Sequence, residues 1–172
     1  MVRSSLGAPL TPASGNRNGY VLEMTAAGDD HAARAFTWDL MLICGDPAAA
    51  ETYFGGFVDR SRISPISCPD NVSFDDEGNL WISTDGNALG SNDGIFRVPV
   101  AGPNRGQVLQ FVTMPRGAEA CGPLIADRSR SLFFAVQHPG ELDGATFENQ
   151  LSTWPHTDDF PRPSVCVAFR RR

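Results

Sequence analysis

Long hydrophobic runs are missing from this sequence. No stretch comes close to the roughly 20 consecutive apolar residues that a transmembrane helix requires, which predicts a chain without a membrane span. The first ten residues also lack the apolar segment of a secretion signal, so no signal peptide is expected in this chain.

Positive charge is also in short supply. The chain has 14 Lys and Arg residues against 20 Asp and Glu residues, which gives a net charge of −6. Proteins bind nucleic acids largely through basic side chains that neutralise phosphates, so we expect no nucleic-acid partner. The acidic balance agrees with cation binding, although an ordinary acidic surface accounts for it equally well.

The cysteines are few and scattered. Cys44, Cys68, Cys121 and Cys166 include no CxxC pair, which argues against a zinc site. Their even number permits disulfides, but buried free thiols are the expected state.

What the 172 residues do contain is a series of short apolar segments separated by Gly, Pro, Asn and Asp, as in an all-β domain. The predicted strands cover residues 20–24, 34–43, 71–74, 80–84, 94–98, 107–112, 124–126, 132–136 and 165–169. Residues 1–18 are predicted to be an irregular lead-in, 48–67 an ordered loop, and 113–122 a loop bearing Glu119. The connection over residues 137–163 is long for a compact domain, which is typical of a functional or disordered segment.

Residues 68–87 predict a β-hairpin with a carboxylate at each outer end. The polar turn contains Gly78, which adopts a positive φ at little cost. Because the chain enters and leaves a hairpin at the same end, Asp70 and Asp85 should lie near each other. Two close carboxylates repel unless a proton or a cation lies between them, and hard divalent cations favour such ligands. The alternative is a pair of solvated turn aspartates.

An internal repeat extends this pattern. Asp75 followed by Leu80-Trp81 recurs 52 residues later as Asp127 followed by Leu132-Phe133. Strand clusters that recur at roughly this interval indicate propeller blades. The sequence therefore predicts an all-β fold, a partial β-propeller of about two blades of antiparallel strands with long loops, although a closed propeller needs four or more blades.

In that arrangement, loops that enter and leave the innermost strands gather at one mouth of the propeller. We therefore expect Asp70, Asp85, Glu119 and the Gln137-His138 segment to converge there. Trp81, Phe133 and Trp154 are expected in the core. The alternatives to a propeller fragment are an assembling subunit or a different fold.

An ordered series of short motifs carries a family resemblance. It runs through Cys68-Pro69-Asp70-Asn71, Gly78-Asn79-Leu80-Trp81, Thr84-Asp85-Gly86, Asn92-Asp93, Pro115-Arg116-Gly117-Ala118-Glu119, Gln137-His138-Pro139-Gly140-Glu141 and Trp154-Pro155. The series resembles the C-terminal half of PhoX-type alkaline phosphatases, over about residues 14–170. The resemblance implies an irregular β-propeller, with residues 19–170 as the C-terminal part of the phosphatase domain.

Family members of this type are periplasmic or secreted enzymes that hydrolyse phosphate monoesters with calcium and ferric iron. They are several times longer, and their earlier blades carry further metal ligands. The resemblance therefore implies that this chain is a fragment without the N-terminal propeller blades, inactive alone. The alternatives are a non-enzymatic, propeller-like binding module and a remnant that does not fold alone.

The resemblance also implies site residues. Asp70, Asp85, Glu119 and Glu23 are expected to bind metal, since calcium and ferric iron take carboxylate oxygens. Arg116 is expected to contact the substrate phosphate, because a guanidinium binds phosphate through two parallel hydrogen bonds. No catalytic residue is assigned, because metal ions can supply the nucleophile. The alternative for each carboxylate is a solvated turn or strand-edge residue.

Overall fold

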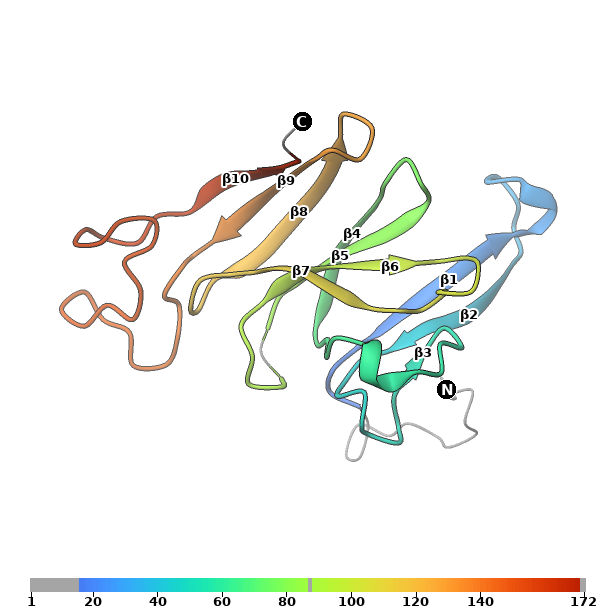
Figure 1. Ribbon diagram of the computed structural model, residues 1–172, viewed down its shortest axis with the longest axis horizontal. Helices are drawn as coiled ribbons and strands as arrows, with labels where there is room; N and C mark the ends of the chain where they lie inside the picture. Colours follow the sequence, from blue (N-terminus) through green and yellow to red (C-terminus); the bar gives the residue numbers. More distant parts are fainter. Residues whose placement is uncertain (1–15, 87, 171–172) are drawn as a thin grey trace.

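A computed structural model describes residues 16–86 and 88–170 of the chain (Figure 1). Strands make up nearly all of its regular structure. They are β1 (Tyr20–Ala26), β2 (Phe36–Ile43), β3 (Tyr53–Phe54), β4 (Pro69–Phe74), β5 (Asn79–Thr84), β6 (Gly94–Pro99), β7 (Leu109–Thr113), β8 (Glu119–Ala126), β9 (Ser131–Gln137) and β10 (Ser164–Phe169). Two short 3-10 helices accompany them, η1 (Ala27–Asp29) and η2 (Arg60–Arg62). Within the described ranges, no helix has the length and apolarity needed to cross a membrane.

The strands form three antiparallel sheets with the orders β1-β2-β3, β4-β5-β6-β7 and β10-β9-β8. The sheets fan out across the molecule, with the four-stranded sheet between the other two (Figure 1). The predicted all-β, partial propeller-like fold is confirmed. The strands form three sheets because β2 pairs with β1 on one side and with β3 on the other, and neither β1 nor β2 pairs with the hairpin of β4 and β5. The predicted lead-in over residues 1–18 lies outside the described residues, apart from 16–18.

The two central strands of the four-stranded sheet, β5 and β6, are buried on both faces. All six residues of β5 are buried, and successive side chains of a strand point to opposite faces. Leu80 and Ile82 join the apolar cluster shared with β2 and β3. Trp81 lies in a second apolar cluster, shared with β8 and β9. The core of the molecule is therefore two apolar layers, one on each side of this sheet.

The turn between β4 and β5 holds a buried carboxylate. The side chain of Asp75 is 2% exposed. Its oxygens accept hydrogen bonds from the backbone N–H and side-chain amide of Asn79, from Trp81 Nε1 at 2.9 Å, and from the backbone N–H of Glu77. Arg97 Nε lies 3.7 Å from Asp75 Oδ2. Sequence reasoning had placed Asp75 in a polar turn, but here it joins the turn to the core through Trp81.

This network makes the stability of the chain depend on pH. Burial alone would raise the pKa of Asp75, but hydrogen bonds from Trp81, Asn79 and Glu77 outweigh burial and hold the pKa below its ordinary value. A carboxyl with a lowered pKa stabilises the fold above its unfolded pKa, about 3.9, and loses this contribution as the pH falls through the folded value. We expect the stability difference between the wild-type chain and Asp75→Asn to shrink below about pH 4. Urea unfolding of both chains at neutral and acidic pH measures it, and a difference independent of pH would contradict it.

Some of the expectations need correction. Glu119 does not lie in a loop over residues 113–122: it opens β8, whose pairing with β9 continues past an irregularity between Cys121 and Leu124. Phe133 is not in the core: it is 39% exposed, since its neighbours in β9 face inward. All four cysteines are free thiols, but only Cys44 is buried.

Candidate active site

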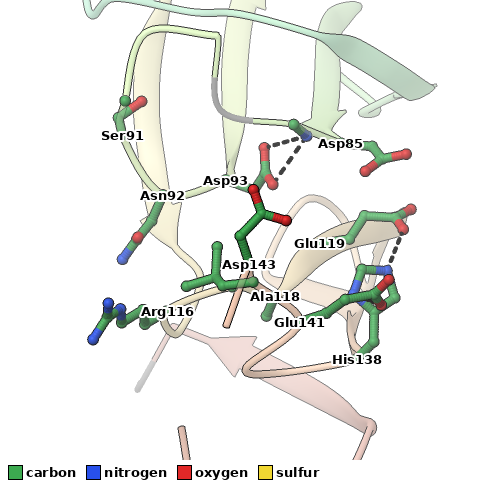
Figure 2. Close-up of a pocket in the computed structure, with 14 residues that line it drawn as sticks. Asp85, Ser91, Asn92, Asp93, Arg116, Ala118, Glu119, His138, Glu141 and Asp143 are labelled. Carbon is green, nitrogen blue, oxygen red and sulfur yellow. Dashed lines mark hydrogen bonds and ion pairs between the residues drawn. The ribbon is translucent and has the colours of Figure 1, made fainter. Parts of the chain in front are cut away.

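Loops from several strand ends line one pocket of about 650 Å³. Asp85 directly follows β5, Asp93 precedes β6, Glu119 opens β8 and His138 directly follows β9 (Figure 2). In antiparallel sheets, alternate connections meet at the same end, which is why residues so distant in sequence share this pocket. The predicted convergence of Asp85, Glu119 and His138 is therefore observed.

The segment after β9 is fixed to the pocket by its backbone. Gly140 N–H donates to the carbonyl of Arg116 at 2.9 Å, and Glu141 N–H donates to that of Gly117 at 3.1 Å. Gly117 has a φ of 67°, and a Cβ there would lie 2.8 Å from the side chain of Leu142. The close approach of the two loops therefore favours glycine at position 117.

Negative charge dominates the pocket. Acidic side chains from two loops and from the start of β8 line it, namely Asp85, Asp93, Glu119, Glu141 and Asp143. Arg116 and His138 are the basic side chains among the described lining residues. Figure 2 shows the carboxylates of Asp93 and Asp143 inside the pocket, whereas the guanidinium of Arg116 points away from them. Such a pocket favours a cation over an anion unless a cation is bound first.

Asp93 connects the β5–β6 loop to the other carboxylates of the pocket. Its carboxylate accepts a hydrogen bond from Thr84 Oγ1 at 2.7 Å, and from Gly86 N–H at 3.0 and 3.1 Å to its two oxygens. Burial raises the pKa of Asp93, and the nearby charges of Asp85 and Glu119 raise it further, against the effect of these hydrogen bonds. Three carboxylates thus interact across one space, and a bound cation would relieve their repulsion.

Glu119 is the pocket carboxylate held most firmly by side chains. Its side chain is 12% exposed, and Gln137 Nε2 donates to its Oε1 at 3.1 Å. His138 Nε2 lies 3.0 Å from Glu119 Oε2, and His138 Nδ1 lies 3.0 Å from Glu141 Oε2. Burial lowers the pKa of His138, but the two glutamates outweigh burial and raise it overall. The imidazole therefore links the carboxylate at the start of β8 to a carboxylate of its own loop.

The other predicted ligands lie elsewhere. Asp70 is exposed on β4 and does not line the pocket, although Asp85 N–H bonds to the Cys68 carbonyl at 3.0 Å as the hairpin predicts. Glu23 lies in β1 and forms an ion pair with Arg105 at 2.5 Å. The metal-binding roles of Asp70 and Glu23 stay predictions.

Sequence reasoning missed three carboxylates of the pocket. Asp93 belongs to the Asn92-Asp93 motif and lies at the other end of the β5–β6 connection from Asp85, so the argument that paired Asp70 with Asp85 applies to it as well. Glu141 and Asp143 lie in the long connection after β9. No periodic pattern marks them, because backbone contacts with the β7–β8 loop decide where this segment lies.

The donor chemistry of the pocket fits hard cations, because carboxylate oxygens are the ligands that calcium and ferric iron take. The donors of the described residues are too few to complete a metal site. Among residues 16–86 and 88–170, no three His, Cys, Asp or Glu side chains come together closely enough to hold one metal ion. The described residues therefore form at most part of a metal centre.

The fold and the pocket define a propeller-like all-β protein with an acidic site at one end of its sheets. Residues 7–140 match the profile of a family described as alkaline phosphatase PhoX. The chain therefore belongs to the PhoX alkaline phosphatase family.

A solved structure supports the assignment over nearly the whole chain. It is Pseudomonas fluorescens PhoX in complex with vanadate, a transition state analogue, with 32% sequence identity and a TM-score of 0.70. The similarity covers 94% of this chain and 28% of that chain, so this chain spans less than a third of the length of that relative. A comparison with curated proteins finds no match.

Proposed function

We propose that the pocket is part of the active site of a calcium- and iron-dependent phosphomonoesterase. The observation that carries the proposal is the interaction of Asp85, Asp93 and Glu119 in one pocket of a PhoX-family chain. Their oxygen donors suit hard cations. Burial first, and then the charges of Asp85 and Glu119, raise the pKa of Asp93, and a cation would relieve the repulsion among the three carboxylates. The vanadate bound to the solved relative supports a phosphate-like substrate.

The residues of this chain take distinct roles in the proposed site. Asp85, Asp93 and Glu119 hold the cations, which when bound offset charge on phosphoryl oxygens. His138 and Gln137 orient Glu119 through their hydrogen bonds. Arg116 lies at the edge of the pocket and its side chain is exposed. Rotation of this side chain brings the guanidinium to a substrate phosphate.

The remaining ligands are proposed to come from the part of a PhoX-length protein that this chain does not match. The chain covers 28% of the solved relative, and its described residues supply no complete metal site. The missing N-terminal propeller blades would then contribute the rest. We also propose that the full-length protein is periplasmic or secreted, as the family resemblance predicts.

We expect the 172-residue chain to turn over p-nitrophenyl phosphate only marginally when calcium and iron are supplied. The physical reason is the incomplete donor set, which leaves the cations weakly held and the transition state poorly stabilised. Turnover measured beside metal content tests this, and robust activity of the chain alone would refute the incomplete site. A non-enzymatic binding module would instead be favoured if calcium does not change the melting temperature of the chain and if Asp85→Ala does not alter that result.

A further inference from the structure

A second pocket opens between the four-stranded sheet and the β8–β10 sheet, apart from the acidic one. Its volume is about 710 Å³, within the range of roughly 300 to 1,000 Å³ that small-molecule sites occupy. The described residues that line the two pockets are all different. Strands β5, β6 and β7 form one side of the second pocket, and β8, β9, β10 and the β8–β9 turn form the other. We call it the inter-sheet cleft.

The wall that belongs to the four-stranded sheet is mostly apolar. Trp81 pairs with Arg97, which pairs with Leu109, so the three side chains form a row on one face of the sheet. The pairing of β6 with β7 shifts at Phe111, which has no partner in β6. Phe111 lies edge-on to Trp81, with the ring centroids 5.1 Å apart, and is 56% exposed. A bulge of this kind redirects a side chain, and here it leaves an aromatic ring open to the cleft.

The opposite wall is a row of apolar side chains across the β8–β10 sheet. Leu132 in β9 pairs with Ile125 in β8 and with Ala168 in β10. All three belong to the apolar cluster that contains Trp81 or pack against it. The deeper part of the space between the sheets is therefore filled, whereas the part beside Phe111 stays open. An apolar body that enters there contacts aliphatic and aromatic side chains on both sides.

Positive charge gathers at the inter-sheet cleft, although the chain as a whole has a net charge of −6. Arg97, Arg130 and Arg170 line the cleft, and no acidic side chain is among its described lining residues. Arg97 already contacts two carboxylates outside the cleft, those of Asp75 and Glu77. The charge that a ligand can meet therefore comes from Arg130 and Arg170.

The backbone holds these two arginines side by side. Arg170 N–H donates to the carbonyl of Arg130 at 2.9 Å, which places the end of β10 beside the β8–β9 turn (Figure 1). Ser129 Oγ accepts from Asp76 N–H at 3.3 Å and ties this turn to the turn between β4 and β5. Arg130 Nε lies 3.9 Å from Asp127 Oδ2, and both side chains are more than a third exposed. Such an exposed ion pair is weak, so an anion can replace it.

We propose that the inter-sheet cleft binds a small amphiphilic anion, an apolar chain or ring that carries one oxyanion group such as a carboxylate. The apolar body lies against Phe111 and Leu132, and the oxyanion meets the guanidinium groups of Arg130 and Arg170. Charge complementarity selects an anion, because a guanidinium binds an oxyanion through two parallel hydrogen bonds. The proposal does not depend on the proposed phosphatase function, whose pocket is lined by other residues.

Isothermal titration calorimetry of the 172-residue chain with octanoate tests the proposal. Two further ligands serve as matched controls, since 1-octanol lacks the charge of octanoate and acetate lacks its chain. We expect octanoate to bind at one site per chain, 1-octanol to bind at least about tenfold more weakly, and acetate to show no binding, because hydrogen bonds to a charged group contribute on that scale. Absence of octanoate binding, or equal affinity for octanoate and either control ligand, would overturn the proposal.

Variants of the chain locate the site. Arg130→Gln should weaken octanoate binding roughly tenfold, whereas Arg128→Gln should leave it unchanged, because Arg128 is exposed in the same turn but does not line the cleft. Phe111→Asp places a carboxylate against the ligand and should abolish binding. Val167→Asp should have no effect, because Val167 is 47% exposed on the opposite face of β10 from Ala168.

The melting temperature of each variant shows whether it folds, so a folded Arg130→Gln or Phe111→Asp chain that binds octanoate unchanged would overturn the proposal. Loss of binding in Val167→Asp would also overturn it, because octanoate would then lie on the other face of the sheet. The same titration of a hybrid, in which this chain replaces the matched segment of Pseudomonas fluorescens PhoX, should again show one octanoate site. A hybrid that binds none would overturn the proposal, since the rest of the protein would then fill the cleft. A hybrid that binds octanoate but hydrolyses no phosphate ester would refute the proposed function alone.

Discussion

Replacing Asp75 by Asn is expected to destabilise the chain by about 3 kcal/mol, near the cost of breaking a buried ionic network. The carboxylate is 2% exposed and accepts hydrogen bonds on both oxygens. An amide of the same shape presents an NH₂ group where one of those oxygens stood. That group then faces a donor, either Trp81 Nε1 or the Asn79 amide, and one donor is left without an acceptor in the core.

Urea unfolding at neutral pH measures this loss, and the melting temperature should fall by about 10 °C. The matched control is Asp76→Asn, at an exposed position next in sequence whose backbone N–H, not its carboxylate, bonds to Ser129 Oγ at 3.3 Å. It should change stability by less than about 0.5 kcal/mol. If the two variants unfold at the same urea concentration, Asp75 does not hold the hairpin to the core.

Replacing Glu119 by Gln is expected to lower phosphatase turnover on the order of 100-fold, the scale of losing one electrostatic contact at a reacting group. The protein to use is a hybrid in which this chain replaces the matched segment of Pseudomonas fluorescens PhoX. Glu119 is 12% exposed, opens a paired strand and is oriented by Gln137 and His138. Its carboxylate is therefore held in place before any cation binds. The amide has nearly the same shape but no charge, so it holds a hard cation far less well.

Turnover of p-nitrophenyl phosphate and metal content should fall together in this variant. The matched control is Glu77→Gln, because the Glu77 carboxylate is 66% exposed and contacts Arg97 at 3.3 Å, away from the pocket. That variant should keep the metal content and the turnover of the unaltered hybrid. A Glu119→Gln hybrid with full metal content and full turnover would remove Glu119 from the proposed ligand set.

Local patterns in the sequence carried much of the architecture. The hairpin of β4 and β5 was predictable because Gly78 marks a turn between two short apolar segments. The same reasoning brought Asp85 to a strand end, where the pocket is found. Asp70 enters the same hairpin but does not line the pocket, because the pairing of backbones does not fix the direction of a side chain, and its metal-binding role stays a prediction.

Which residues line the acidic pocket depends on tertiary contacts that no local sequence pattern predicts. Asp143 reaches it only because the backbone of Gly140 and Glu141 bonds to the β7–β8 loop. Glu119 was expected in a loop over residues 113–122, but it opens β8, a strand that tolerates an irregularity between Cys121 and Leu124. The pairing of β8 with β9 decides this, since tertiary hydrogen bonds outweigh a local turn preference.

The sequence by itself determined the all-β class, most strand positions and the PhoX resemblance, because these depend on alternation, turn residues and short ordered motifs. The tertiary structure alone decided which carboxylates share a pocket, and that Asp75 is a buried acceptor and not a solvated turn residue. Each of these depends on which strands pack against one another, and packing joins residues whose separation along the chain carries no local signal.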